Sequence, residues 1–179
     1  MLNNLTKINR SLFFWLLIFL LLPFAAFAWS GKCVSVHDGD TISVLHEGKA
    51  ERIRLYGIDC PERRQPFGKK AKWFTSDLVF GKIVEVKPGT KDRYGRTIAW
   101  VYVDGICLNK ELLRAGLAWH YKRYSKDKDL AELEMETRMK RIGIWSDPNP
   151  IPPWEWRRAK RAEEQLKEWQ EQYKKQRIK

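Results

Sequence analysis

The sequence predicts a small α+β domain built on a closed or nearly closed barrel of five strands, with three short helices. Between Cys33 and Val103, apolar residues alternate with polar ones or form short β-branched runs that turn signals interrupt, which is typical of strands. Apolar residues three or four positions apart indicate helices in three other stretches. A chain of 179 residues has room for one such domain with appendages.

Five segments have the pattern of strands. The first leads into a turn at Asp38-Gly39 and the second leaves that turn, while Glu47-Gly48 reads as a hairpin turn into the third. Five strands combined with three short helices favour a barrel. The predicted strands are Cys33–Val36, Thr41–Val44, Arg52–Tyr56, Ile83–Val86 and Ile98–Val103.

Three segments place apolar residues on one helical face. Asn109 lies near the expected start of the second helix, where we expect its side-chain oxygen to cap free backbone N–H groups. The three faces consist of Ala71, Phe74 and Leu78, then Leu108, Leu112 and Ala115, and finally Ala131, Met135, Met139 and Ile142.

The composition changes after residue 147. Four prolines between Pro148 and Pro153 cannot continue a helix. From Arg157 to Lys179 there are nine Lys or Arg residues and four Glu, with apolar residues recurring every three or four positions. We therefore expect a domain over 29–147, followed over 148–179 by a Pro-rich linker and a basic amphipathic helical tail. We favour a helix that packs back on the barrel or stays partly solvated over a dedicated DNA-binding or dimerising arm.

Residues 1–28 have the features of a secretory signal peptide. Lys7 and Arg10 precede an uncharged run rich in Leu and Phe, and Ala26-Phe27-Ala28 has the pattern that signal peptidase accepts. We expect cleavage before Trp29 and a secreted or periplasmic protein. The alternative is an uncleaved membrane anchor, because the apolar run approaches the length of a spanning helix.

The chain is strongly basic, with a net charge of +12 that remains +10 after the two cations Lys7 and Arg10 are removed. Such an excess favours polyanionic partners, with nucleic acid as the leading candidate and an anionic membrane surface as the alternative. The three histidines are scattered and no C-x-x-C pair occurs, so the sequence does not indicate a zinc site.

Three cysteines, Cys33, Cys60 and Cys107, lie in the part that we expect to be exported. An odd number leaves at least one thiol unpaired within the chain. Two arrangements remain open: a disulfide between Cys33 and Cys107, or three reduced and mostly buried thiols.

Polar residues cluster in a fixed order at the ends of predicted strands. Asp40 follows the first turn and Asp59 precedes Pro61, so two carboxylates lie at neighbouring strand ends, where carboxylate, carbonyl and water oxygens could hold calcium. Taken alone, each residue has an ordinary explanation: Asp40 as a turn residue, Glu62 as a carboxylate in a first helical turn, and Arg54 as an exposed strand residue.

A third cluster, Asp92-Arg93-Tyr94-Gly95-Arg96, changes this assessment. This pattern predicts a turn, with Arg96 as a second arginine just before a predicted strand. Two guanidinium groups suit a phosphodiester under attack, because planar forks match phosphate oxygens that gain negative charge in the transition state. The clusters together predict metal-assisted cleavage of a phosphodiester.

The chain resembles the staphylococcal nuclease (thermonuclease) family from about Cys33 to Trp145. The motifs that carry the resemblance are VxDGDT, RLxGIDxPE, DRYGR, DGICLNxELLRAGLA and IGIWS, in this order. The resemblance implies an OB-fold barrel and a calcium-dependent phosphodiesterase that acts on DNA and RNA and leaves 3′-phosphate products.

The resemblance also implies roles for individual residues. Arg54, Glu62 and Arg96 match the catalytic positions, with Glu62 orienting or deprotonating the attacking water. Asp40 and Asp59 match the calcium carboxylates, and Cys60 matches a position that contributes its backbone carbonyl. Better-known members have threonine there, but a carbonyl ligand does not depend on the side chain. The substrate-binding positions correspond to Tyr94, which would contact a phosphate, and to Tyr121 and Tyr124, which would flank a base.

Two other function classes remain open at this stage. One is a non-catalytic nucleic-acid-binding OB module, although every expected polar position of the motifs is filled. The other is a membrane-anchored envelope protein that places its basic C-terminal helix on anionic lipid. We expect no obligate protein partner and a monomer, while the apolar stripe of the tail permits self-association.

Overall fold

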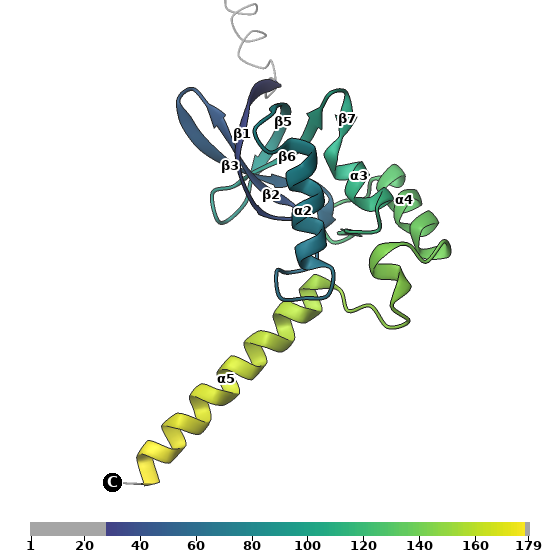
Figure 1. Cartoon of the computed structure of the whole chain (residues 1–179). Helices are drawn as coiled ribbons and strands as arrows, with labels where there is room; N and C mark the ends of the chain where they lie inside the picture. Colours follow the sequence, from purple (N-terminus) through teal and green to yellow (C-terminus); the bar gives the residue numbers. More distant parts are fainter. Residues whose placement is uncertain (1–27, 178–179) are drawn as a thin grey trace, which may run out of the picture.

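The computed structural model describes residues 28–177, and its centre is a closed five-stranded barrel (Figure 1). Neighbouring strands pair antiparallel in the order β3-β2-β1-β5-β6, and a parallel pairing of β3 with β6 closes the ring. This confirms the predicted fold class. The barrel strands are β1 (Trp29–Asp38), β2 (Thr41–His46), β3 (Lys49–Leu55), β5 (Ile83–Lys91) and β6 (Thr97–Val103).

Short strands complete the sheet structure. β7 (Ile106–Cys107) pairs with β6, and β4 (Ile58–Asp59) forms a separate ladder with β8 (Trp119–His120). In that ladder Asp59 is the register partner of Trp119. The segment that carries Asp59 is therefore paired with the chain directly after the DGICLNxELLRAGLA motif.

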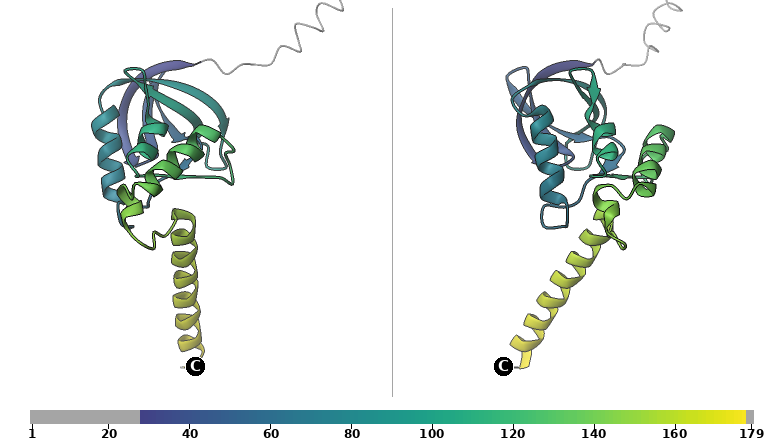
Figure 2. Two further views of the ribbon diagram at one scale, coloured as in Figure 1. Left: turned by 90° about the vertical axis from the view of Figure 1, so that its right-hand side faces the viewer. Right: turned by 45° about the vertical axis from the view of Figure 1, so that its right-hand side comes forward.

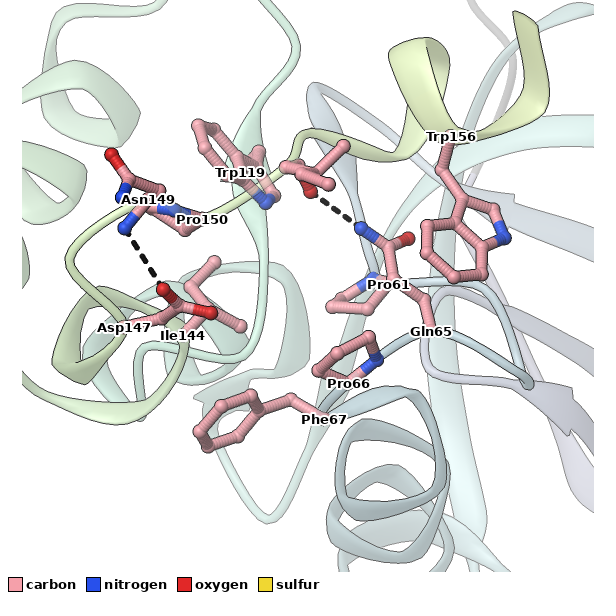
Figure 3. Close-up of a pocket in the computed structure, with 11 residues that line it drawn as sticks. Pro61, Gln65, Pro66, Phe67, Trp119, Ile144, Asp147, Asn149, Pro150 and Trp156 are labelled. Atoms are coloured by element: carbon pink, nitrogen blue, oxygen red, sulfur yellow. Dashed lines mark hydrogen bonds between the residues drawn. The ribbon is translucent and has the colours of Figure 1, made fainter. Parts of the chain in front are cut away.

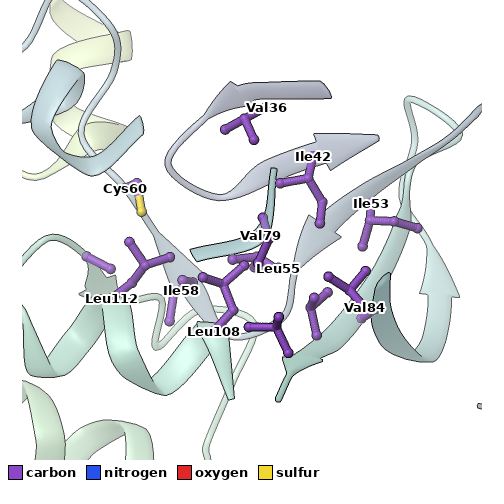
Figure 4. Packing of buried hydrophobic residues seen from close by; sticks show 14 of the residues in the cluster. Val36, Ile42, Ile53, Leu55, Ile58, Cys60, Val79, Val84, Leu108 and Leu112 are labelled. Carbon is purple, nitrogen blue, oxygen red and sulfur yellow. The ribbon is translucent and has the colours of Figure 1, made fainter. Parts of the chain in front are cut away.

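Alternating side chains fill the barrel interior, as Figure 4 shows. In β6 every second residue from Thr97 to Val103 is buried. Ile42, Ile53 and Leu55 point into the same cluster from β2 and β3 and are almost fully enclosed. Because side chains in a strand alternate between two faces, this period-two burial explains why the strands were predictable.

Within residues 28–177, three α-helices and one 3₁₀ helix pack around the barrel and a fourth α-helix projects from it. α2 (Gly68–Val79) packs on β1, and α3 (Leu108–Arg114) lies between β6 and α4 (Lys128–Met139). The 3₁₀ helix η1 (Gly143–Ser146) contacts α4 and places Trp145 against Trp119. α5 (Pro153–Arg177) ends the described chain. The three predicted helical stretches are all helices.

The predicted apolar face of α4 is wrong. Met135 and Met139 are exposed, and the helix instead buries Leu130, Glu134 and Thr137. The buried Glu134 carboxylate accepts a hydrogen bond from the backbone N–H of His120, at 3.1 Å. The helix therefore turns a polar residue inward to satisfy a buried backbone donor, which apolar periodicity does not reveal.

The predicted capping role of Asn109 is also wrong. Its buried amide oxygen accepts a hydrogen bond from the backbone N–H of Val101, and its amide nitrogen donates to the carbonyl groups of Tyr56 and Ala99. The side chain thus bridges β6 to the end of β3. Cys107, the residue before α3, makes no side-chain cap.

Cys33, Cys60 and Cys107 are all free thiols, so the structure has the reduced arrangement and not the disulfide alternative. Burial raises the pKa of each of the three thiols. Protonated, buried thiols behave as small apolar side chains in the core.

The C-terminal helix begins earlier than predicted. Pro153 occupies its first position, which proline favours because the N–H that it lacks has no partner within the helix there. Only the first turn packs against the domain, and all residues from Arg158 to Arg177 are exposed. Two further views show the same helix projecting from the body (Figure 2). The tail therefore packs back in part and stays solvated for most of its length.

The predicted signal peptide lies outside the described residues, apart from Ala28, and stays a prediction. Within residues 28–177, none of the helices combines the length and apolar character that crossing a bilayer requires.

Candidate active site

Asp40, Arg54 and Asp59 meet at one end of the barrel. Asp40 lies in the turn between β1 and β2, Arg54 near the end of β3, and Asp59 on β4. The Arg54 guanidinium is ion-paired with Asp40 through Nη1, and its Nη2 donates to Asp59 Oδ1 at 2.8 Å and to the Ile58 carbonyl at 3.1 Å. The two aspartates that the sequence singled out therefore converge within the span of one guanidinium group.

Both aspartates are removed from solvent. Asp40 is 4% exposed and Asp59 is 1% exposed, while the Arg54 side chain is 13% exposed. Buried carboxylates need positive partners or hydrogen-bond donors, because desolvation penalises their charge. Arg54 supplies part of that compensation for both residues.

Backbone contacts fix the Asp40 turn. Asp38 Oδ1 accepts a hydrogen bond from the N–H of Asp40, and the carbonyl of Asp40 accepts one from the N–H of Leu55 at 2.9 Å. Gly39 lies so close to its neighbours that a Cβ there would come within 2.8 Å of the Cβ atoms of Cys60 and Ala71. Glycine is required here because the turn packs directly on the segment after β4 and on α2.

Glu62 lies in the loop between β4 and α2. Its backbone N–H donates to Gln65 Oε1 at 3.1 Å, and its carbonyl accepts from the N–H of Gln65 at 2.8 Å. A Cβ at Gly68 would be 1.9 Å from the same carbonyl oxygen, so the start of α2 holds this loop by close backbone approach. The Glu62 side chain is 40% exposed, as access of water to a catalytic carboxylate requires.

Arg96 reaches the site indirectly. Its Nε donates to Asp92 Oδ2 at 2.7 Å, and its Nη1 lies 3.5 Å from Thr41 Oγ1, which donates to Asp40 at 3.3 Å. Burial alone would raise the pKa of Asp92, but hydrogen bonds from Arg96 and Tyr94 lower it. An ionised Asp92 therefore holds Arg96 beside Thr41, one residue away from Asp40.

The three predicted substrate tyrosines fall into two places. Tyr94 is exposed in the turn before β6, with its ring beside the guanidinium groups of Arg93 and Arg96. Tyr121 and Tyr124 lie together after β8, with their ring centroids 4.8 Å apart. Tyr124 is exposed, whereas the ring of Tyr121 stacks on Trp154 at 5.4 Å.

Arg157, which the sequence did not single out, contacts two carboxylates of this site from outside the domain motifs. Its Nη2 donates to Asp59 Oδ2 at 2.7 Å, and its Nη1 donates to Glu62 Oε1 at 2.6 Å and to Asp59 Oδ1 at 3.3 Å. Burial lowers the pKa of Arg157, but the two carboxylates more than offset this and raise it. In the sequence, only the pattern Trp154-Glu155-Trp156-Arg157-Arg158 near the start of the basic helix could have indicated this role.

A pocket lies between the segment 61–67 and the linker before α5 (Figure 3). The side chain of Gln65 crosses it and donates to the carbonyl of Ile151, while Pro66 and Phe67 form one wall. Trp119 and Trp156 also line the pocket. Gln65 thus connects the loop that carries Glu62 to the linker.

The donor set suits a hard cation with an open coordination sphere. Within residues 28–177, His, Cys, Asp and Glu side chains form no group of three or more that is arranged to hold a metal ion. Asp40 and Asp59 provide two converging, buried carboxylates, and Asp59 already attracts a second positive group in Arg157. Calcium accepts such a site, because carbonyl and water oxygens can complete its flexible coordination.

Comparisons with known proteins agree with the motifs and the fold. A family model described as "Staphylococcal nuclease homologue" matches residues 52–147. An "Uncharacterized endonuclease" of Escherichia coli O157:H7 is 43% identical over 142 residues, which cover 75% of this chain and 93% of that protein. A "Micrococcal nuclease" of Shigella flexneri is 41% identical over 146 residues, covering 74% of this chain and 84% of that protein. The chain therefore belongs to the staphylococcal nuclease family.

Proposed function

We propose that this protein is a calcium-dependent nuclease that hydrolyses phosphodiester bonds of DNA and RNA and leaves 3′-phosphate ends. Membership of the family supports phosphodiester hydrolysis. The observation that carries the proposal is the single Arg54 guanidinium that joins two buried aspartates, with Glu62 linked to the same cluster through Arg157. Residues from separate motifs of the sequence thus form one cluster of charged side chains.

Asp40, Asp59 and the backbone carbonyl of Cys60 would hold the calcium ion. The residues present fit this role, because both carboxylates are buried and converge on the same guanidinium group. When bound, calcium would polarise a phosphate oxygen and neutralise charge that develops on it.

Glu62 is the candidate for activating water. Its carboxylate is accessible to solvent, and the hydrogen bonds between Gln65 and the backbone of Glu62 fix the loop that carries it. A carboxylate in this place can orient a water molecule or accept its proton during in-line attack on phosphorus.

The two arginines supply positive charge for the transition state. Arg54 is held by both aspartates and Arg96 by Asp92, so each guanidinium is oriented before substrate binds. Groups that are oriented in advance stabilise developing negative charge without a cost of reorganisation. The N–H donors that these pairs leave free are suited to phosphate oxygens.

Several features support nucleic acid as the substrate. The net charge of +12 attracts a polyanion over long range. Tyr94 and Tyr124 expose aromatic rings that could stack on bases or contact the sugar-phosphate chain. Both DNA and RNA carry these groups, so we include both in the proposal.

We also propose that the protein is exported and that residues 1–28 are removed. The charge, apolar run and Ala26-Phe27-Ala28 sequence of this segment support cleavage before Trp29. Mass spectrometry of the mature N-terminus tests the proposal. A start at Trp29 is expected, whereas retention of Met1 would favour the membrane-anchored alternative.

A nuclease assay tests the proposed chemistry. Wild type and the Glu62→Ala variant are compared on DNA and RNA, with calcium or with a chelator, and the product ends are analysed. We expect calcium-dependent cleavage by wild type, 3′-phosphate ends, and a loss of turnover in the variant. Binding without cleavage by folded wild type in the presence of calcium would instead indicate the non-catalytic OB module.

A further inference from the structure

The first turn of α5 covers the carboxylates of the candidate active site. Arg157 donates to both oxygens of Asp59, at 2.7 and 3.3 Å, and to Glu62 Oε1 at 2.6 Å. One of these carboxylates is the candidate metal ligand and the other is the candidate for activating water. The side chain of Arg157 is 33% exposed, so this contact lies at the solvent-facing side of the cluster.

Two further contacts hold this turn in place. The ring of Trp154 stacks on Tyr121, with the planes 2° apart, and meets Trp119 edge-on at 5.7 Å. Before the helix, the carbonyl of Ile151 accepts the hydrogen bond from Gln65 that Figure 3 shows. These contacts of Ile151 and Trp154, which precede Arg157 in the chain, therefore fix the position of Arg157.

The rest of the helix adds nothing to this attachment. All residues from Arg158 to Arg177 are exposed, and the helix points away from the domain in each view (Figure 2). Release of the first turn would expose Trp154, Trp156 and Arg157 but would leave the barrel core intact. Because only the few side chains of this turn attach the helix to the domain, we expect the attachment to open and close reversibly.

The charges of the cluster make Arg157 a competitor of a bound cation. Asp40, Asp59 and Glu62 contribute three negative charges, against which Arg54 and Arg157 place two positive ones. A divalent ion on Asp59 would share the oxygens of that residue with the Arg157 guanidinium. Because like charges a few ångströms apart in a partly buried site repel strongly, occupation by one disfavours the other.

We propose that the first turn of α5 is an autoinhibitory plug in which Arg157 takes the place of the divalent cation on Asp59 and blocks Glu62. Calcium and the plug bind in competition, so calcium binding releases the turn and uncovers the site. The inference rests on the proposed function, because it assigns calcium to Asp59. It adds a control of that site by a segment outside the matched family region, which ends at residue 147.

Calorimetric titration of the purified protein with Ca²⁺ alone, without nucleic acid, tests the competition. Arg157→Ala should bind calcium about tenfold more tightly than wild type if the plug is docked in roughly nine-tenths of wild-type molecules. Arg158→Ala is the matched control, because it removes the same charge from the exposed part of the same helix. Equal calcium affinities of wild type and Arg157→Ala, or an equal change in Arg158→Ala, would overturn the proposal.

Nuclease kinetics separate inhibition from a direct role in catalysis. In Arg157→Ala the calcium concentration for half-maximal cleavage should fall by the same factor, while the maximal rate at saturating calcium stays within about twofold of wild type. A large loss of maximal rate at saturating calcium would show that Arg157 assists the reaction, and this would overturn the proposal.

Hydrogen exchange of wild type provides a test that no substitution can disturb. Addition of calcium should speed exchange of the backbone amides in residues 151–157, whereas the amides of β6 should keep their protection. Unchanged or slower exchange in 151–157 on calcium binding would contradict release of the plug.

The outcomes for the two proposals are distinguishable. If every variant binds calcium as expected but none cleaves nucleic acid, the proposed function fails and the competition stands. If wild type is an active nuclease and Arg157→Ala has unchanged calcium affinity, the plug fails and the function stands.

Discussion

Replacement of Arg54 with lysine tests whether the guanidinium fork organises the site. Arg54 is paired with Asp40, donates to Asp59 Oδ1 at 2.8 Å and donates to the Ile58 carbonyl at 3.1 Å. A lysine ammonium keeps the charge but cannot span both carboxylates in the same planar geometry. The change therefore removes one charged contact while it leaves the net charge of the cluster unaltered.

Arg54→Lys should lower both the stability and the turnover of the protein, because it removes one contact of the guanidinium group. Loss of one hydrogen bond to a charged group costs about 1.5–3 kcal/mol. Asp59 keeps Arg157 as a partner, so we expect a value near the lower end, about 2 kcal/mol in the free energy of unfolding. Removal of one oriented donor from a transition state lowers turnover by roughly 10²–10³-fold. We therefore expect the loss of transition-state stabilisation to exceed the loss in the free energy of unfolding.

Chemical denaturation and steady-state nuclease kinetics provide the two readouts. Arg52→Lys is the matched control, because Arg52 lies two residues earlier on the same strand and is exposed. This control should change stability by less than about 0.5 kcal/mol and leave turnover unchanged. Wild-type turnover in Arg54→Lys would refute the reasoning, and a loss of stability without a loss of turnover would reduce Arg54 to a structural residue.

Three further changes test other parts of the account. Gly39→Ala should lower the free energy of unfolding by about 1–3 kcal/mol and reduce turnover, because its Cβ would press on Cys60 and move Asp40; unchanged denaturation midpoints would contradict this. Arg96→Ala should reduce kcat by roughly 10²–10³-fold with little change in KM for DNA, and equal losses in both would count against its role. Burial lowers the pKa of His120 below its usual 6.5, which Glu134 offsets only in part, so the unfolded chain binds the proton more readily. The stability that His120 contributes is therefore fully present above about pH 6.5 and is lost as the pH falls towards its lower folded-state pKa. The melting temperature of wild type should drop more between pH about 7.5 and about 5.5 than that of His120→Gln, and parallel drops would refute the assignment.

The barrel strands were predictable because each strand buries one face, so that apolar residues recur at every second position. Ile42, Ile53 and Val101 are apolar residues of alternating segments, and each points inward. The meeting of Asp40, Arg54 and Asp59 was predictable for a different reason, since these residues occur in short motifs at strand ends. The pairing of β2 with β3 places Arg54 opposite Thr41, next to Asp40, and the short connection from β3 to β4 brings Asp59 to the same end of the barrel.

Long-range polar contacts were not predictable from the sequence. Glu134 and Asn109 are buried because they satisfy backbone groups of other elements, and apolar periodicity carries no trace of such partners. Arg157 lies nearly 100 positions from Asp59, in a segment where basic residues have the ordinary explanation of a solvated helix. The path of the linker past Gln65 and the stacking of Trp154 on Tyr121 together place it at the site.

In our proposal the carboxylates and guanidinium groups form one cation-dependent site for phosphodiester cleavage. A calcium titration of cleavage of a defined oligonucleotide by wild type and Asp59→Asn tests it most directly, with Asp77→Asn on α2 as the control. We expect saturable calcium dependence in wild type and in the control, and no calcium-stimulated cleavage in Asp59→Asn. Cleavage by folded Asp59→Asn at the wild-type rate and with the same calcium dependence would contradict it.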